Sequence, residues 1–289
     1  MMRLRVLVDN CALIDRYFLA EPAVSYLIEA DGLRLLFDAG YSDVYLRNAA
    51  SMGEDLSRLD YVVISHGHDD HTGGLAYWPA LNGRPTLAAH PDAFGLKRHG
   101  GLSIGSPLSR EELATRFELR LTREPLWLSP RLVFLGQIPR LNGFEGLKPV
   151  GERLKPAASA DRRDDGCDRG DRAGDASAYE PDFVLDDSAL AWKGDDGLVV
   201  VSGCSHAGIV NIVEYAMELC GERRLAAVIG GFHLLEADDE RLRRSAERLA
   251  ALAPRVVYAA HCTDLAAKIR LAAELPIREL GVGSELVYR

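Results

Sequence analysis

The chain has 289 residues, of which 47% are hydrophobic and 27% are charged, as in an ordinary folded protein with a large core. This composition excludes a disordered chain, a collagen-like chain and a small disulfide scaffold. The formal net charge of −9 argues against a general binder of nucleic acid or membranes, but is compatible with a basic pocket for one anionic ligand.

The first half of the chain is rich in patterns that are typical of strands. Two apolar runs separated by Glu29-Ala-Asp-Gly32 predict a β-hairpin. Helical spacing follows over residues 43–52, and a short helix is expected over residues 75–81. A further helix begins at Ser109, where the Ser-x-x-Glu112 pattern is a capping box. Strands are expected at residues 25–28, 33–37, 61–64, 86–89, 117–121 and 132–135.

The composition changes abruptly over residues 155–182, which contain no Leu, Ile, Val, Met, Phe or Trp. Such a segment cannot bury enough apolar surface to offset the entropy lost on ordering it. We therefore expect a single domain over residues 1–289 that carries a polar, flexible insertion at about 155–182. A lid over the active site is the alternative interpretation of this segment.

Strands and helices alternate in the last third of the chain. Apolar runs predict strands at residues 198–201, 225–229 and 256–259, and amphipathic spacing predicts helices at residues 207–219, 236–252 and 265–273. Hairpins followed by this alternation predict a mixed α/β fold, in which helices cover mixed β-sheets.

The cysteines and the N-terminus bear on the cellular compartment. The five cysteines form no Cys-x-x-Cys pair, which is typical of free thiols in a reducing compartment. The first apolar run is interrupted by Asp9 and is too short for a signal peptide, and no run approaches the roughly 18 residues of a membrane helix. We expect a cytoplasmic protein without membrane or nucleic-acid partners, and its oligomeric state stays open.

A histidine cluster, His66-x-His68-x-Asp70-His71, directly follows the strand at residues 61–64. The first two histidines flank a glycine and can face one cation, while Asp70 and His71 can serve a second. Two metal ions about 3.5–4 Å apart can share a bridging hydroxide that acts as a nucleophile. A polar surface loop is the alternative, but three of the eight histidines fall within six positions, which favours metal binding.

Three further histidines follow predicted strands at strand-to-helix corners, where α/β proteins usually display ligands. His206 and His261 are the candidate distal metal ligands. His233 is the candidate for a substrate contact or for a group that supports the ligands.

The cluster resembles the H-x-H-x-D-H signature of the metallo-β-lactamase superfamily, and Leu36-Phe-Asp38-Ala-Gly40 resembles the first motif of that superfamily. Later motifs resemble one subgroup, the dihydropterin-ribofuranosylaminobenzene-phosphate synthase-like proteins. They are Ile138-Pro-Arg140, Phe144-Glu145, Asp186-Asp187-x-Ala189-Leu190, Gly203 to Asn211, Gly230 to Leu234 and His261-Cys-Thr263. The resemblance spans nearly the whole chain except residues 155–182.

The resemblance implies an αββα sandwich with two divalent metal ions at one edge between the sheets. Asp38 is expected to support the metal ligands from behind. The implied ligand sets are His66, His68 and His206 for the first ion, and Asp70, His71 and His261 for the second.

The sequence departs from the superfamily pattern at Cys204, where many members place a metal-bridging aspartate. A thiolate ligand would favour zinc, whereas a site of nitrogen and oxygen ligands leaves iron or manganese open. Because Gly203 allows a turn, we expect one of the two nearby donors to reach the metals. His206 is then the ligand and Cys204 a buried neighbour.

These residues predict a metal-dependent hydrolase in which a bridging hydroxide attacks a small, anionic metabolite. Asp70 would orient the hydroxide and pass on its proton, and two zinc ions are the favoured cofactors. Arg140 is a candidate for binding a substrate phosphate or carboxylate, with a plain surface arginine as the alternative. The competing hypotheses are a pterin-related synthase and a non-enzymatic metal or ligand sensor of the same fold.

Overall fold

The computed structural model describes residues 1–79, 83–155 and 176–289, and all structural statements concern these residues. Their largest sheet has the strand order β17 (Glu285–Tyr288), β1 (Met2–Val8), β2 (Ser25–Ala30), β3 (Leu33–Phe37), β4 (Tyr61–Val63), β5 (Thr86–Ala89) and β8 (Glu118–Leu121). The second sheet has the order β16 (Val257–Ala260), β15 (Leu225–Gly231), β14 (Gly197–Ser202), β13 (Ala189–Gly194), β10 (Leu132–Phe134) and β9 (Leu126–Trp127).

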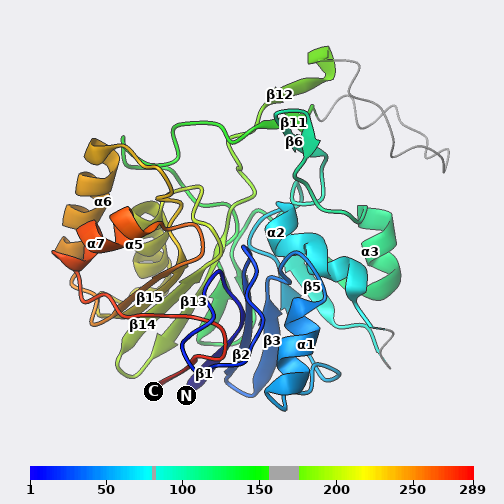
Figure 1. Ribbon diagram of the computed structural model, residues 1–289, viewed down its shortest axis with the longest axis horizontal. Helices are drawn as coiled ribbons and strands as arrows, with labels where there is room; N and C mark the ends of the chain where they lie inside the picture. The colour runs from blue at the N-terminus through cyan, green and yellow to red at the C-terminus, as the bar shows by residue number, and fades with distance from the viewer. Residues whose placement is uncertain (80–82, 156–175) are drawn as a thin grey trace.

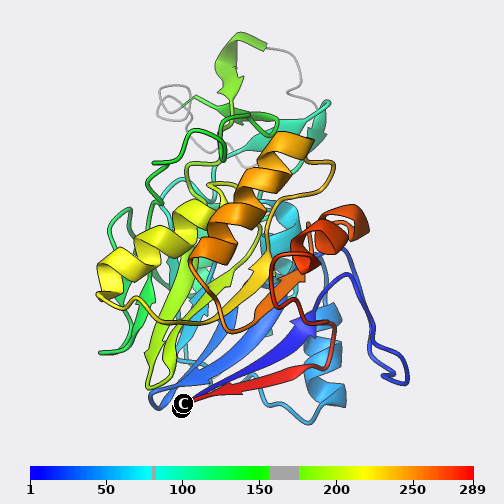
Figure 2. The same ribbon diagram turned by 90° about the vertical axis from the view of Figure 1, so that its left-hand side faces the viewer.

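The two large sheets pack face to face, and helices cover both outer faces (Figure 1). The first sheet is covered by α1 (Val44–Ser51), α2 (Asp69–Thr72), the 3-10 helix η1 (Gly73–Tyr77) and α3 (Arg110–Arg116). The second is covered by α5 (Ile209–Cys220), α6 (Asp239–Ala251) and α7 (Leu265–Ala272), which lie in front of it in Figure 2. This is the αββα arrangement that the resemblance implies.

The alternation of side chains along the buried strands produces these layers. In β14, Val199 and Val201 belong to the core between the two sheets, whereas Leu198 and Val200 face the helices. In β3, Phe37 enters the core between the sheets, while Leu36 packs in the cluster that contains Tyr45 of α1. Because successive residues of a strand point to opposite faces, continuous apolar runs bury both faces of a sheet.

A smaller sheet lies at the end of the molecule opposite to both termini (Figure 1). Its strand order is β12 (Tyr179–Pro181), β11 (Glu152–Leu154), β6 (Lys97–His99) and β7 (Leu102–Ser103), and the 3-10 helix η2 (Ala176–Ala178) precedes β12. Residues 176–182 therefore fold, although the sequence predicts a flexible insertion over the whole of 155–182. Backbone pairing with β11 and a buried ion pair at Asp182 stabilise them without apolar side chains. The rest of that predicted insertion, residues 156–175, lies outside the described residues.

Most predicted elements agree with the structure within one to three residues, and Ser109 and Glu112 form the predicted capping box. The bounds of the helix expected over residues 75–81 are wrong. Helical structure begins at Asp69 and ends at Tyr77, and residues 80–82 lie outside the described part. The acidic side chains of Asp69 and Asp70 favour a helix N-terminus, so the histidine motif itself starts the helix. None of the helices in the described residues is long and apolar enough to cross a membrane.

Candidate metal centre

The ends of parallel strands place the predicted donors at one edge of the sandwich. Strand β3 is parallel to β4, and β14, β15 and β16 run parallel to one another, so their carboxyl ends meet at the same edges. Asp38 and His66 follow β3 and β4 in the first sheet. His206, His233 and His261 follow β14, β15 and β16 in the second sheet.

Three histidines form the first donor set. One ring nitrogen from each of His66, His68 and His206 lies within 4.8 Å of those of the other two, and all three residues are buried. The ring centroids of His66 and His68 lie 4.7 and 4.8 Å from that of His206. The two sheets thus bring together histidines about 140 residues apart in sequence, as the resemblance implies.

The first set contains ring nitrogens that the protein leaves without a partner. Among the described residues, His68 Nε2 and both ring nitrogens of His206 are buried and make no hydrogen bond. Burial lowers the pKa of His206 well below its ordinary value and that of His68 to about 4, so both rings are neutral. A neutral imidazole with an unused nitrogen is the form that binds a metal ion, so this set fits one.

Four residues form the second donor set: Asp70, His71, Cys204 and His261. Asp70 Oδ2 lies 3.1 Å from His261 Nε2 and 3.5 Å from His71 Nε2. The Cys204 sulfur lies 3.3 Å from His71 Nε2. The two sets adjoin at His71, because its ring centroid is 4.2 Å from that of His66 in the first set.

The second set has an excess of negative charge around its histidines. Burial alone would lower the pKa of His71. The carboxylates of Asp70 and Asp38 nevertheless hold that pKa well above its ordinary value. The surrounding groups therefore favour a positive charge at this point. A bound cation supplies that charge, so the second set also fits a metal ion.

Asp38 and Ser65 orient the histidines of the first sheet from behind. Asp38 Oδ2 accepts a hydrogen bond from His71 Nδ1 at 2.7 Å and one from the Ser65 hydroxyl at 2.8 Å. The backbone N–H of Ser65 donates to Asp38 Oδ1 at 2.7 Å, and its hydroxyl lies 3.0 Å from His66 Nδ1. These contacts leave the Nε2 atoms of both histidines turned toward the donors, as in many metal sites.

Asn10 orients His261 in the same way. Asn10 Oδ1 lies 2.9 Å from His261 Nδ1, and the backbone N–H of His261 lies 3.4 Å from Asp9 Oδ1. Burial raises the pKa of Asp9 to about 6. Neither Asp9 nor Asn10 was predicted as part of the site. They follow the apolar run that forms β1, so the same strand-end argument could have found them.

The structure places both Cys204 and His206 among the candidate donors, and the expectation that His206 alone is the ligand stays a prediction. Both residues reach the centre, and they join different donor sets. The bend lies at Ser205, with a φ of 63°, and not at Gly203. Gly203 instead allows a close approach, because a Cβ there would lie 2.2 Å from the Ser65 hydroxyl oxygen.

Four of the nine non-glycine residues with a positive φ in the described part of the chain lie at the centre. Asp38, Ser205, His233 and His261 all have a positive φ, between 41° and 63°. Outside glycine such conformations cost about 1–3 kcal/mol each and persist only where packing and hydrogen bonds enforce them. The fold therefore fixes the directions of these corners before any ligand binds.

Buried carboxylates hold the loops that carry the donors. Asp186 Oδ2 accepts the backbone N–H of Gly67 at 2.8 Å, between the first two histidines of the motif. Asp187 Oδ2 accepts the N–H of Ala207 at 2.7 Å, next to His206, and burial raises the pKa of Asp187 to about 7. The Asp186-Asp187 pair belongs to the motifs that resemble the subgroup, and its sequence alone indicates no role. The structure shows that it fixes both loops of the first set.

Gly67 is required where it stands. A Cβ at this position would lie 1.7 Å from the carbonyl oxygen of Ala93, which no side chain can tolerate. The glycine of the His-x-His motif therefore allows the loop to pack against its neighbour, while Asp186 holds its N–H.

Arg140 does not lie free beside the donors. Its guanidinium donates to the carbonyl oxygens of Gly146 and Val184 at 3.0 Å each and to that of Phe183. These bonds tie together two loops that line a neighbouring cavity. The structure thus gives Arg140 a role in shaping the cavity, and its predicted contact with a substrate anion stays a prediction.

A cavity of about 430 Å³ opens beside the first donor set, with His206 and His233 in its lining. The two rings lie 4.1 Å apart between centroids. The backbone N–H of His233 donates to the Cys262 sulfur at 3.1 Å, which holds the loop in place. His233 thus lies between the donors and the cavity, where a substrate contact is expected.

A family model described as the metallo-beta-lactamase superfamily matches residues 20–261. The chain belongs to this superfamily. Enzymes of the superfamily bind small-molecule substrates and typically hold divalent metal ions, which agrees with the two donor sets.

Relatives support the membership and the subgroup. An uncharacterized protein of Methanocaldococcus jannaschii is 33% identical over 250 residues, 83% of this chain and 83% of that protein. A protein of the same organism named 7,8-dihydropterin-6-methyl-4-(beta-D-ribofuranosyl)-aminobenzene-5'-phosphate synthase is 29% identical over 281 residues, 92% of this chain and 89% of the relative. A solved structure described as a metal-dependent hydrolase of the beta-lactamase superfamily has 28% identity and a TM-score of 0.80, and covers 100% of both chains. The resemblance inferred from the motifs is confirmed.

Proposed function

We propose that this member of the metallo-β-lactamase superfamily is a metal-dependent hydrolase that acts on a small, anionic metabolite. The observation that supports it best is the pair of adjoining donor sets, with buried ring nitrogens in the first and an excess of negative charge in the second. The similarity to a structure described as a metal-dependent hydrolase agrees with this proposal.

Two divalent ions, zinc first among the candidates, would occupy the two sets. His66, His68 and His206 would hold one ion, and Asp70, His71 and His261 the other, with Cys204 as a further donor. When bound, such ions polarise the scissile bond and lower the pKa of water to near neutrality. An all-histidine set leaves a position open for water or substrate, as catalytic zinc sites do.

Asp70 is the residue proposed to handle the proton. Burial alone would raise the pKa of Asp70. The neighbouring His71 and His261 nevertheless hold that pKa well below its ordinary value, so the carboxylate is ionised. An ionised carboxylate accepts a hydrogen bond from the attacking water and so fixes the direction of its lone pair. The same oxygen can pass the proton to the leaving group.

A panel of phosphodiesters, lactones and thioesters tests the activity. We expect zinc-loaded protein to hydrolyse at least one of these classes. Chelation should abolish turnover and added zinc should restore it. An inert panel, combined with saturable binding of a dihydropterin, would instead favour a pterin-related synthase, the second candidate that the 29% identical relative supports.

The metal content gives a prediction that does not depend on the substrate. Protein reconstituted with excess zinc and then desalted should contain two zinc ions per chain by elemental analysis, because each donor set offers three or more ligands. A content of one ion or none after reconstitution would contradict the dinuclear proposal.

The proposed role of Cys204 gives a spectroscopic prediction. X-ray absorption of the zinc form should show one sulfur neighbour at about 2.3 Å beside nitrogen and oxygen neighbours at about 2.0–2.1 Å. The sulfur signal should disappear in Cys204→Ser and persist in Cys262→Ser, because the Cys262 sulfur lies in neither donor set. A wild-type spectrum without sulfur would return Cys204 to the packing role predicted from the sequence.

A further inference from the structure

The cavity beside His206 and His233 carries three positively charged side chains: Lys148, Arg241 and Arg244. Two of them already have partners. Lys148 lies 3.4 Å from Asp238, and Arg244 lies 3.6 Å from Glu240 with its guanidinium 4.5 Å from the Phe144 ring centroid.

Arg241 differs from the other two cations. Its Nε is buried and makes no hydrogen bond to any described residue, and no ion pair joins its guanidinium to a carboxylate there. Its backbone N–H donates to Asp238 Oδ1 at 2.9 Å, so the N-terminal cap of α6 fixes the position from which the side chain extends. Arg241 lines the cavity without a carboxylate partner among the described residues, so an acidic ligand there would supply the missing counter-charge.

Apolar side chains form the remaining wall of the same cavity. Phe144, Phe183 and Leu235 line it, and Phe183 and Leu235 are 40% and 61% exposed. Exposed apolar groups beside an unpaired cation are suited to an organic ring or chain that carries an acidic group.

We propose that Arg241 binds the acidic group of the substrate, a phosphate or a carboxylate, while Phe144, Phe183 and Leu235 hold its apolar body. This places the opposite end of the substrate at His206 and His233, next to the donor sets. The planar guanidinium can offer two parallel N–H groups to either acid. The inference rests on the proposed function, since it names the class of molecule that the hydrolase would accept.

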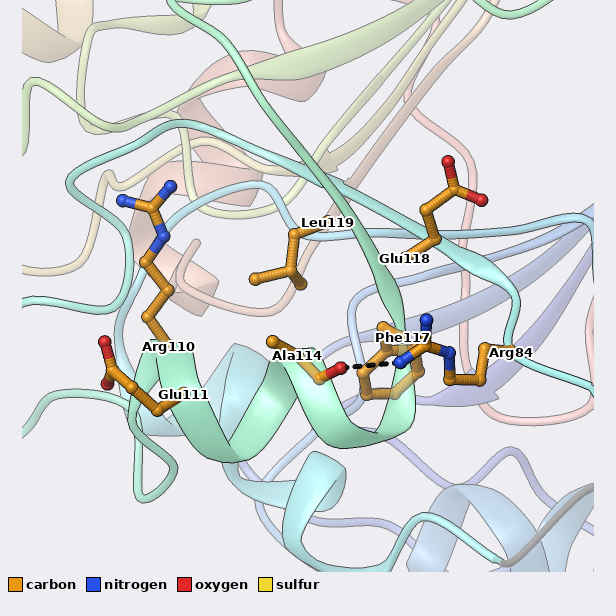
Figure 3. Close-up of a pocket in the computed structure, with 7 residues that line it drawn as sticks. All are labelled: Arg84, Arg110, Glu111, Ala114, Phe117, Glu118 and Leu119. Carbon is orange, nitrogen blue, oxygen red and sulfur yellow. Dashed lines mark hydrogen bonds between the residues drawn. The ribbon is translucent and has the colours of Figure 1, made fainter.

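A second cavity, of about 410 Å³, does not offer the same arrangement (Figure 3). It lies over α3 and β8, and its lining contains none of the residues of the donor sets. Its Arg84 already donates to the carbonyl oxygen of Ala114 at 2.9 Å, the dashed line in Figure 3.

Ligand-observed NMR titration of zinc-loaded protein tests the proposal with three probes of similar shape: phenylphosphonate, benzoate and benzyl alcohol. Phenylphosphonate has no hydrolysable bond, so binding is measured without turnover. At least one of the two acids should bind the wild type, and the tighter one identifies the acidic group. In Arg241→Ala its Kd should rise about 10- to 100-fold, as expected for a lost charged hydrogen bond.

Arg243→Ala is the matched control, because Arg243 lies on the same helix, pairs with Glu247 and does not line the cavity. Its Kd for the acid should stay within about twofold of the wild type, and Arg241→Ala should bind benzyl alcohol as the wild type does. Equal Kd values in Arg241→Ala and Arg243→Ala, an equal loss for all three probes, or a wild type that binds neither acid would overturn the proposal. The titration measures binding alone, so an inert hydrolysis panel would not contradict the role of Arg241. Likewise, a failure of the titration would not contradict hydrolysis by the donor sets.

Discussion

Replacing Asp70 by asparagine should reduce hydrolysis by about 10²–10⁴-fold and lower the zinc content from two ions per chain to one. The carboxylate lies 3.1 Å from His261 Nε2 and 3.5 Å from His71 Nε2, so it is both a donor of the second set and the proposed proton carrier. An amide of the same size keeps the shape but loses the charge and the ability to accept a proton. A positioned acid or base contributes this range of rate acceleration.

Asp69→Asn is the matched control for Asp70→Asn. Asp69 is the preceding residue at the start of α2, and it belongs to neither donor set. Elemental analysis, circular dichroism and kcat/KM with whichever substrate the panel identifies should show Asp69→Asn unchanged. An Asp70→Asn variant that keeps two ions and wild-type turnover would refute the role of Asp70.

The donors of the site were predictable from the sequence because strand ends are predictable. His66, His206 and His261 each follow an apolar run that reads as a buried strand, and carboxyl ends of parallel strands share an edge. Hairpins followed by alternating strands and helices predicted mixed sheets covered by helices. The αββα arrangement itself was implied by the resemblance to the superfamily.

The supporting contacts were not predictable in the same way. Asn10 meets His261 across about 250 residues of sequence, and Lys97 meets Asp186 across about 90. Such pairs depend on how the two sheets and the small sheet are placed in space, which no local pattern determines. The turn between Cys204 and His206 was missed because Ser205 rarely adopts a positive φ, so sequence reasoning placed the bend at the neighbouring glycine.

The small sheet shows a similar limit. The strands β6, β7, β11 and β12 have two or three residues each, and several of their side chains are exposed or half-buried. They lack the apolar alternation from which strands are predicted, because pairing and ion pairs stabilise them more than burial does. Lys97 of β6 is the exception, since its side chain is only 2% exposed.

Lys97→Met should lower the free energy of unfolding by about 3–5 kcal/mol at neutral pH, the usual cost of breaking a buried ion pair on one side. The Lys97 ammonium group lies 2.7 Å from Asp182 and 2.8 Å from Asp186, and both carboxylates are at most 2% exposed. Without the lysine, two carboxylates stay buried in the wall between the small sheet and the Gly67 loop. Urea unfolding followed by circular dichroism measures the loss.

Lys148→Met is the matched control, because Lys148 is 84% exposed and its ion pair with Asp238 spans 3.4 Å. Exposed pairs of this kind contribute at most about 1 kcal/mol, so the control should unfold almost as the wild type does. A Lys97→Met variant as stable as Lys148→Met would show that the buried network contributes nothing to the fold.

The pH dependence separates a charge effect from a packing effect in Lys97→Met. Burial alone would raise the pKa of Asp186. The Lys97 charge instead lowers that pKa to about 2, below the ordinary value of about 3.9 in an unfolded chain. The stability that this ion pair contributes is therefore present above about pH 4 and is lost as the pH falls toward 2. In Lys97→Met, burial without the lysine charge raises the pKa of Asp186. The cost of burying the ionised carboxylate is then removed as the falling pH protonates it. The stability difference between the two proteins should be largest at neutral pH and shrink as the pH falls toward 2, whereas a packing defect alone would leave it constant.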